Sequence, residues 1–297
     1  MPEPISHRQD GSIMKNGRES FSAYLDESEE SSIGVYVVGG FVGKAQVWEE
    51  FTTKWLECLP TAITCFHATD CFTGNKQFEG LDIPERVRIL DKLTDVILAH
   101  EVRLFGYGLD VKTYRKLAPK AKQNEFLENK YAAPFGGAVQ LACESMGNPP
   151  TPDNISRILK QGERWQQCAF FIESNEYSAS AKRTIANMRN SHDLWFRDRI
   201  GRETYGTKSG RDGIPSLQVA DLGAFLAAKY ISKSPEGKIS WKAYYEKLKS
   251  ARRVCRTVQA DEYSLNALHQ TYEESKQEAA QKARGDGSRS PTSSSGS

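Results

Sequence analysis

The chain has 297 residues, 38% of them hydrophobic and 10% aromatic, which is enough to bury a substantial core. Its 40 basic and 38 acidic side chains leave a formal charge of +2, so net charge gives no sign of nucleic-acid binding. The six scattered cysteines contain no CxxC pair, which disfavours a disulfide framework and a zinc site.

The two ends differ in composition from the rest of the chain. Residues 1–20 are polar and lack periodicity, which predicts a loose N-terminal arm, and the Ser/Gly-rich residues 276–297 predict a disordered tail. Residues 21–275 are expected to form one α/β domain. There is no apolar signal segment near the N-terminus, and no run of the roughly 18 apolar residues that a membrane helix needs, so we expect a cytoplasmic protein without a membrane partner.

The first half of this domain predicts three strands and two helices. Residues 21–26 are typical of a strand, and so are residues 34–42, GVYVVGGFV, whose paired glycines indicate a bulge or a close backbone approach. Residues 45–59 have helical spacing. A third strand is predicted over residues 62–68, AITCFHA, and Pro84 then begins a helix that ends near residue 100.

The second half continues the alternation of strands and helices. A fourth strand at residues 101–110 leads into a helical insertion at about 110–165, which is broken by prolines. A fifth strand is predicted at residues 167–174, and the remaining helices at residues 178–196, 215–230 and 241–254. This order predicts an α/β fold with a mixed five-stranded sheet flanked by helices.

Asp221 is a carboxylate in the middle of the apolar segment PSLQVADLGAFLAAKY, residues 215–230. At helical spacing, apolar side chains lie on both sides of it. A buried ionised carboxylate must pair with a cation, coordinate a metal ion or take up a proton. We interpret Asp221 as a metal ligand; the alternative is a structural Asp in a buried salt bridge, for example with an Arg of the preceding loop.

Further candidates follow the predicted strands. Asp26 ends the first strand and Glu173 ends the fifth, at the edge where α/β sheets usually carry their sites; Glu176 is a nearby alternative to Glu173. His67 and Asp70 follow the third strand. The structural alternatives are solvated strand ends for the acids, a core histidine for His67, and a turn or helix cap for Asp70.

Asp26, Glu173 and Asp221 together form an all-oxygen ligand set without thiolates. Such a set suits Mg²⁺ or Mn²⁺ rather than zinc. Two such ions about 4 Å apart can hold the attacking and leaving oxygens of a phosphoryl transfer. Acids that met without a metal ion would repel one another, so a bound cation explains why they would converge.

Five segments of the chain resemble the domain of unknown function 3800 family, which is thought to have a ribonuclease H-like fold. They are AYLDESEE, YVVGGFV, FHATD, FFIES and LQVADLGAFLA, and they lie between about Ala23 and Tyr230. The resemblance implies carboxylates on the first strand, a later strand and a C-terminal helix, which map here to Asp26, Glu173 and Asp221. His67 and Asp70 match the position after the third strand, where the family often has a polar or acidic residue.

A basic segment lies between Glu173 and Asp221 in the sequence. Residues 182–211 have a net charge of +5, and we expect them to border the same cleft and to contact phosphates, with Lys182, Arg183 and Arg211 as the leading candidates. Interleaved aromatic side chains are available for stacking on bases. The alternative is an exposed, salt-bridged helix followed by a loop. The basic residues are Lys182, Arg183, Arg189, Arg197, Arg199, Arg202, Lys208 and Arg211, and the aromatic ones Trp195, Phe196 and Tyr205.

These features lead to the hypothesis of a divalent-metal-dependent nuclease of ribonuclease H-like type. Asp26, Glu173 and Asp221 would hold Mg²⁺ or Mn²⁺, Asp70 or His67 would complete the catalytic site, and the partner would be DNA or RNA. One alternative is a non-catalytic module that binds nucleic acid or protein, favoured because no counterpart of the second-helix Glu of ribonuclease H is found. Another is a hydrolase of a small phosphorylated molecule.

Overall fold

The computed structural model describes residues 19–117, 129–147, 166–190, 197–208, 213–262 and 265–266. The predicted arm at residues 1–20, apart from its last two residues, and the predicted tail at 276–297 lie outside these ranges. Trp195, Phe196, Arg211 and much of the expected insertion at 110–165 also lie outside them.

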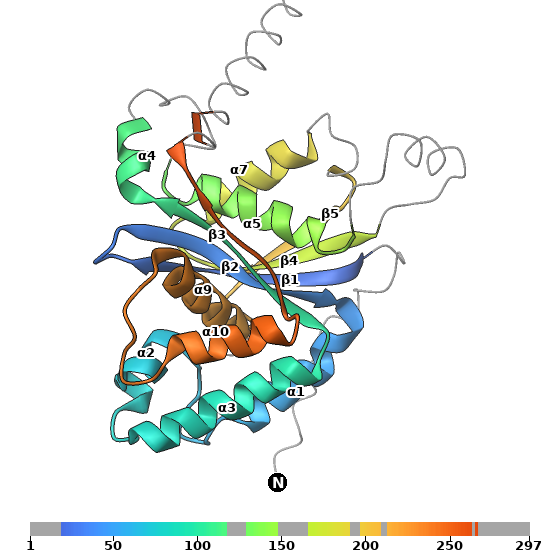
Figure 1. Ribbon diagram of the computed structural model, residues 1–297. Coiled ribbons are helices and arrows are strands. Elements are labelled where there is room, and N and C mark those ends of the chain that lie inside the picture. The colour runs from blue at the N-terminus through green and yellow to red at the C-terminus, as the bar shows by residue number, and fades with distance from the viewer. Residues whose placement is uncertain are drawn as a thin grey trace, which may run out of the picture.

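A mixed sheet with the strand order β5-β4-β1-β2-β3-β6 forms the centre of the α/β fold (Figure 1). The first three strands form an antiparallel meander, β4 and β5 continue it in parallel beside β1, and β6 lies parallel to β3 at the opposite edge. The bounds are β1 Glu19–Glu30, β2 Val35–Lys44, β3 Val102–Asp110, β4 Gln167–Glu173, β5 Ile200–Gly206 and β6 Val254–Ala260.

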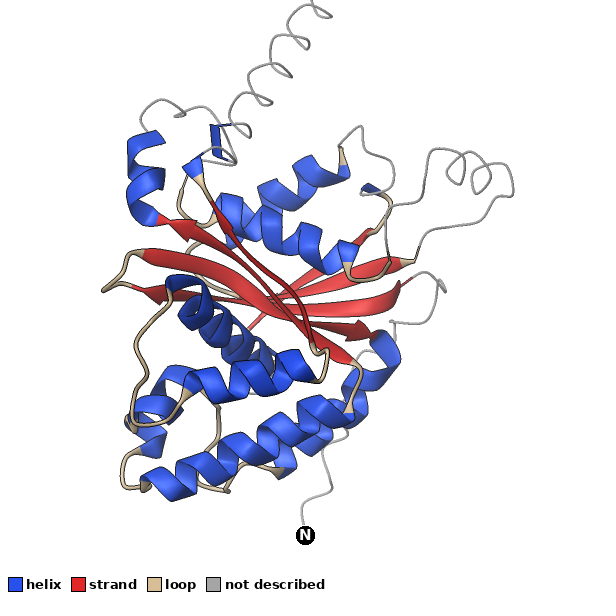
Figure 2. Ribbon diagram, viewed as in Figure 1, coloured by secondary structure: helices blue, strands red, loops and turns tan. Residues whose placement is uncertain are grey.

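Helices cover both faces of this sheet (Figure 2). One face carries α9 (Leu217–Ser232) directly on the strands, with α1 (Trp48–Glu57), α2 (Ala68–Thr73), α3 (Ile83–Ala99) and α10 (Trp241–Ser250) around it. The other face carries α5 (Ala132–Glu144) and α7 (Ser178–Arg189), while α4 (Val111–Leu117) follows β3. Short 3₁₀ turns, η2 (Ala45–Val47) and η3 (Lys76–Phe78), precede α1 and α3.

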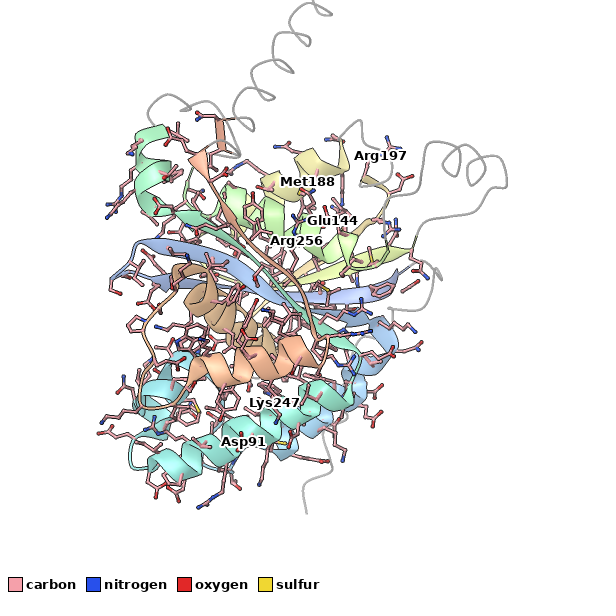
Figure 3. The ribbon with its side chains drawn as sticks, viewed as in Figure 1. Asp91, Glu144, Met188, Arg197, Lys247 and Arg256 are labelled. Carbon is pink, nitrogen blue, oxygen red and sulfur yellow. The ribbon has the colours of Figure 1, made fainter. Side chains whose placement is uncertain are left out.

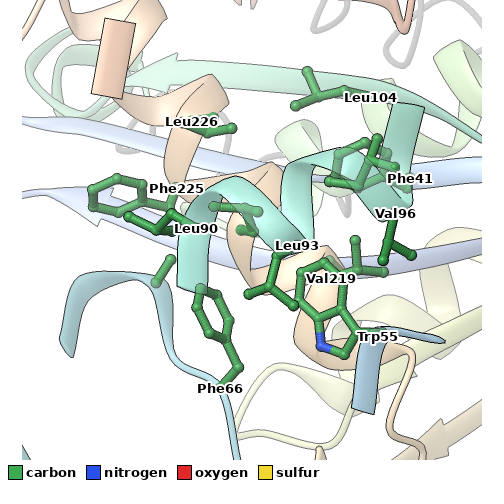
Figure 4. Close-up of a cluster of buried hydrophobic side chains, with 14 of the residues drawn as sticks. Phe41, Trp55, Phe66, Leu90, Leu93, Val96, Leu104, Val219, Phe225 and Leu226 are labelled. Carbon is green, nitrogen blue, oxygen red and sulfur yellow. The ribbon is translucent and has the colours of Figure 1, made fainter. Parts of the chain in front are cut away.

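Each face has its own hydrophobic core. The cluster on the α9 face includes Phe41 of β2, Trp55 of α1, Phe66, Leu90 of α3 and Phe225 of α9 (Figure 4). Alternate residues of the same strands point into the α5 face, where they pack against α5 and α7. On that face Arg256 of β6 pairs with Glu144 of α5 at 3.8 Å (Figure 3), so α5 is also linked to the sheet edge.

The glycine pair in β2 allows α9 to lie close to the sheet. A Cβ on Gly223 of α9 would lie 2.9 Å from the Cα of Gly40 and 3.0 Å from the Phe41 ring. A Cβ on Gly39 would lie 2.8 Å from the carbonyl oxygen of Phe105 in β3. The close backbone approach predicted from the GG pair is therefore confirmed, and it brings the start of α9 against β1 and β2.

Two predictions about the sheet are wrong. Residues 62–68 form no strand, because side-chain amides satisfy their backbone N–H groups: Thr64 donates to Gln77 Oε1 at 2.7 Å, and Phe66 donates to Gln218 Oε1 at 3.0 Å. The sheet has six strands instead of five, because β5 and β6 also belong to it. Both are edge strands with mostly half-buried residues, so they lack the apolar runs that identify the central strands.

Candidate functional site

Three acidic side chains from separate elements meet on the α9 face of the sheet. Asp26 lies within β1 and not at its end as predicted, because Glu27 to Glu30 continue the pairing with β2. Glu173 ends the adjacent parallel strand β4. Tyr24 of β1 and Phe171 of β4 lie on the same face of the sheet, where they stack with ring centroids 4.6 Å apart. Asp221 comes from the second turn of α9, which packs across β1 and β2. The structure thus brings together the three carboxylates that the sequence singled out as metal ligands.

The ammonium group of Lys208 lies at the centre of these carboxylates. Its Nζ is 2.6 Å from Asp26 Oδ2, 2.9 Å from Glu173 Oε2 and 2.8 Å from Asp221 Oδ1. The Lys208 side chain is only 6% exposed, and that of Asp26 only 2%. Lys208 follows β5 and was one of eight basic residues expected to contact phosphates; nothing in the local sequence distinguishes it from the other seven.

Asp221 has two further partners, both at the start of α2. The backbone N–H of Ala68 donates a hydrogen bond to Asp221 Oδ2 at 2.5 Å, and His67 Nδ1 lies 3.6 Å from Asp221 Oδ1. His67 Nε2 lies 3.7 Å from Cys65 Sγ. These contacts fix the orientation of the Asp221 carboxylate. Together with Lys208 they explain why an acid is tolerated inside an apolar helix, because a buried carboxylate needs hydrogen bonds and a countercharge.

Burial and the Lys208 charge shift the pKa values of these groups in different directions. Burial raises the pKa of Asp26 well above its usual value. The Lys208 charge lowers this pKa in part, and a hydrogen bond with Glu173 raises it further. Burial also disfavours ionised Asp221, but Lys208, His67 and the Ala68 N–H together lower its pKa. The hydrogen bond to Asp221, supported by Cys65, raises the pKa of His67 to about 10. The Lys208 ammonium and the His67 imidazolium thus supply positive charge to the cluster, and the raised pKa of Asp26 favours its neutral form.

Asp70 and Glu176 have surroundings of their own. Asp70 is buried in α2 and pairs with Nζ of Lys76, an exposed lysine, at 3.2 Å, whereas the three clustered acids pair with buried Lys208. Glu176 is exposed in the turn before α7. Among the acids proposed as catalytic, Asp26, Glu173 and Asp221 therefore form the cluster, with His67 at its edge.

The predicted phosphate contacts are divided between the two faces of the sheet. Lys182 and Arg183 lie on α7, which packs on the α5 face because Ala181 and Ile185 are buried there, so these two residues are separated from the carboxylates by the sheet. Arg202 is on the carboxylate face, where its guanidinium lies 5.9 Å from the centroid of the Phe171 ring. The shared cleft predicted for residues 182–211 is therefore wrong for α7, while Arg211 lies outside the described residues.

The donor atoms of the cluster suit a hard divalent cation, but their spacing suits an ammonium group. Carboxylate oxygens surround Nζ at 2.6–2.9 Å, whereas Mg²⁺ requires about 2.0–2.1 Å. Within the described ranges, no group of three or more His, Cys, Asp or Glu side chains is arranged to hold a metal ion. The type of donor atom suits such an ion, but the arrangement does not: Lys208 would have to leave the centre and the carboxylates would have to move closer together.

Comparison of this chain with protein-family models, with curated proteins and with solved structures finds no match. The resemblance to the domain of unknown function 3800 family thus rests on the quoted residues alone. In the part of the chain that the structure describes, the helices are too short or too polar to cross a bilayer.

Proposed function

We propose that the chain is a divalent-metal-dependent phosphodiesterase of ribonuclease H-like type that acts on nucleic acid. The observation that carries this proposal is the convergence of Asp26, Glu173 and Asp221 on one buried cationic group. Carboxylates on the first strand, a later strand and a C-terminal helix are what the family resemblance implies. An antiparallel meander continued by two parallel strands is compatible with that fold.

In this proposal the three carboxylates hold Mg²⁺ or Mn²⁺ after Lys208 has moved out of the centre. A bound ion of this kind activates water and stabilises the charge that develops on a phosphodiester. The chain itself keeps the ligands in place: Ala68 N–H and His67 orient Asp221, and the close packing of Gly223 on Gly40 fixes α9 against β2. Arg202, on the same face, is placed to attract a phosphate.

A second candidate is a non-catalytic binding module on the same fold. It is favoured by Lys208, whose ammonium completes the carboxylate cluster without any metal ion. In that case the four side chains form a buried salt-bridge network, as the structural alternative for Asp221 anticipated, although with a lysine in place of the arginine.

The two candidates are separated by a cleavage assay with purified full-length protein. Single- and double-stranded DNA and RNA are incubated with Mg²⁺, with Mn²⁺ or with EDTA. We expect cleavage that requires the metal ion and falls at least about a hundredfold in Asp221→Asn, because one of three ligands loses its charge. A matched control is Asp95→Asn, which removes an exposed acid of α3 that pairs with Lys247 at 2.9 Å.

Cleavage that persists in EDTA, or an Asp221→Asn variant as active as wild type, would contradict the metal-dependent mechanism. Binding of nucleic acid without cleavage in any of these conditions would favour the second candidate.

A further inference from the structure

A cavity lies beside the carboxylate cluster on the same face of the sheet. It has a volume of about 340 Å³ and is lined by the end of β1, by α2 and α9, and by the loop that leads into α10. Small-molecule sites span roughly 300–1,000 Å³, so this one is large enough for a single small ring system with its sugar. The end of β1, α2 and the loop before α10 lie around one end of α9 (Figure 1).

The cavity and the cluster share three elements. Ser28 lines the cavity and is two residues beyond Asp26 on the same face of β1, a separation of about 7 Å. Phe225 lines it one helical turn beyond Asp221, about 6 Å along α9. Thr69 lines it next to Ala68, whose N–H binds Asp221. A molecule with a phosphate at the cluster could therefore extend into the cavity.

The walls of the cavity suit a flat and uncharged group. Phe72 and Phe225 have ring centroids 4.6 Å apart, and buried Trp241 and Ile239 complete an apolar side. The lining also carries hydroxyl groups; within the described part of the chain, those of Ser28 and Thr69 have no hydrogen-bond partner. Aromatic walls and available hydroxyls are the groups that stack on a base and bind its edge.

The charges in the cavity argue against a phosphate there. Its charged lining residues are Glu29, Glu30 and Lys229. Glu29 is paired with Lys130, and Glu30 with Lys229, so no lining cation is left over for an anion. A phosphate is thus better placed near the cluster and Arg202, and a neutral ring in the cavity.

We propose that this cavity, lined by Ser28, Thr69, Phe72, Phe225 and Trp241, is a nucleobase subsite for the nucleotide next to the scissile phosphodiester. The inference rests on the proposed function for the position of the phosphate. It adds a substrate class: the preferred substrate is a single strand, or an end with an unstacked base, because a base within a duplex cannot enter the cavity.

The test uses neutral nucleosides and no metal ion, so that it does not depend on catalysis. Adenosine and uridine are titrated in EDTA into ¹⁵N-labelled full-length protein, and the indole N–H signal of Trp241 is followed after assignment with Trp241→Phe. The Trp241 indole donates to the Pro235 carbonyl at 3.4 Å, and both residues line the cavity, so this signal reports on its occupancy.

Thr73→Trp fills the cavity, and Thr53→Trp is its matched control. Both threonines are exposed helix residues whose hydroxyl donates to the carbonyl four residues earlier, at 2.7 Å for Thr73 and 3.1 Å for Thr53, but only Thr73 lines the cavity. We expect at least one nucleoside to shift the Trp241 signal in wild type and in Thr53→Trp. Its affinity should be at least about tenfold weaker in Thr73→Trp, because base stacking is lost.

The proposal is overturned if neither nucleoside shifts the signal, or if Thr73→Trp binds as wild type does. It is also overturned if N-acetyltryptophanamide binds more tightly than both nucleosides, since the cavity would then suit a peptide side chain. Nucleoside binding by a protein that cleaves no phosphodiester would contradict the proposed function but not the subsite. Metal-dependent cleavage without nucleoside binding would contradict the subsite alone.

Discussion

Lys208 holds together a group of side chains that would otherwise repel one another. Three carboxylates face one ammonium, so its charge alone does not balance theirs. The positive charge of His67 and the raised pKa of Asp26 reduce the remaining negative charge. Burial and the hydrogen bond with Glu173 raise the pKa of Asp26, whereas Lys208 lowers it. A single divalent ion supplies more positive charge than the ammonium. Exchange of Lys208 for such an ion would therefore leave the cluster closer to neutral without the extra protons.

At the scale of the residue, Lys208→Met should destabilise the metal-free protein by about 3–5 kcal/mol at neutral pH, because it leaves buried carboxylates without their countercharge. The Lys208 interaction lowers the pKa of Asp221 from 3.8, so its contribution is present above that pH and is lost as the pH falls below it. The difference from wild type should consequently shrink in acid. Urea unfolding in EDTA from neutral pH to acid measures it.

Lys229→Met is the matched control for this substitution. Lys229 also pairs with a carboxylate, that of Glu30, but its side chain is 24% exposed. We expect a loss of no more than about 1 kcal/mol. A Lys208→Met variant as stable in EDTA as this control would contradict the countercharge role.

The sequence could predict the three acids of the site but not its central lysine. Asp26 and Glu173 follow apolar strand residues, and Asp221 interrupts an apolar helix, so each stands out against its neighbours. Lys208 lies in GTKSGRDG, a segment with turn-forming residues, where a lysine is ordinary. Its role comes from contacts with carboxylates that lie on β1, β4 and α9, far from Lys208 in the sequence, and a local pattern does not contain such contacts.

At the scale of the element, the contact between α9 and β2 sets the position of Asp221. Gly223→Ala would place a methyl group 2.9 Å from the Gly40 Cα. This distance is too short for a contact between carbon atoms, so the backbone of α9 or β2 would have to shift. Overpacking costs about 1–3 kcal/mol and alanine regains about 1 kcal/mol of helix propensity, so we expect a net loss of up to about 2 kcal/mol in urea unfolding.

Gly237→Ala is the control, because the nearest heavy atom to its added Cβ would be 3.8 Å away. It should change the free energy of unfolding by less than about 0.5 kcal/mol. An equal effect of the two substitutions would show that the close contact between α9 and β2 does not depend on a glycine at position 223.

Among the elements, those with a clear apolar pattern are the ones that the sequence predicts. The strands β1 to β4, the long helix α3 and the buried helix α9 have continuous apolar or periodic side chains. The segment AITCFHA has the composition of a strand, but side-chain amides of Gln77 and Gln218 replace strand pairing there. Edge strands β5 and β6 carry charged and polar residues because one side of each is unpaired.

At the scale of the whole molecule, the sheet separates two sets of basic residues. Arg202 is on the carboxylate face, whereas Lys182 lies on α7, with its Nζ 5.0 Å from the Tyr205 ring on the opposite face. A polyanion bound at the cluster should contact Arg202 and not Lys182. Arg202→Ala should therefore weaken binding of a single-stranded oligonucleotide and reduce the slope of log K against log salt by about 1, while Lys182→Ala leaves both unchanged.

Fluorescence anisotropy over a range of salt concentrations measures both quantities. A larger effect of Lys182→Ala than of Arg202→Ala would place the nucleic acid on the α7 face, away from the carboxylates.

The most direct test of the proposed metal site is calorimetric titration of Mn²⁺ into wild type, Lys208→Met and Asp221→Asn. We expect wild type to bind Mn²⁺, Lys208→Met to bind it at least about tenfold more tightly because no ammonium competes, and Asp221→Asn to lose most of the affinity. If neither wild type nor Lys208→Met binds Mn²⁺, the three carboxylates form a salt-bridge network with Lys208 and no metal site, and the metal-dependent function is excluded.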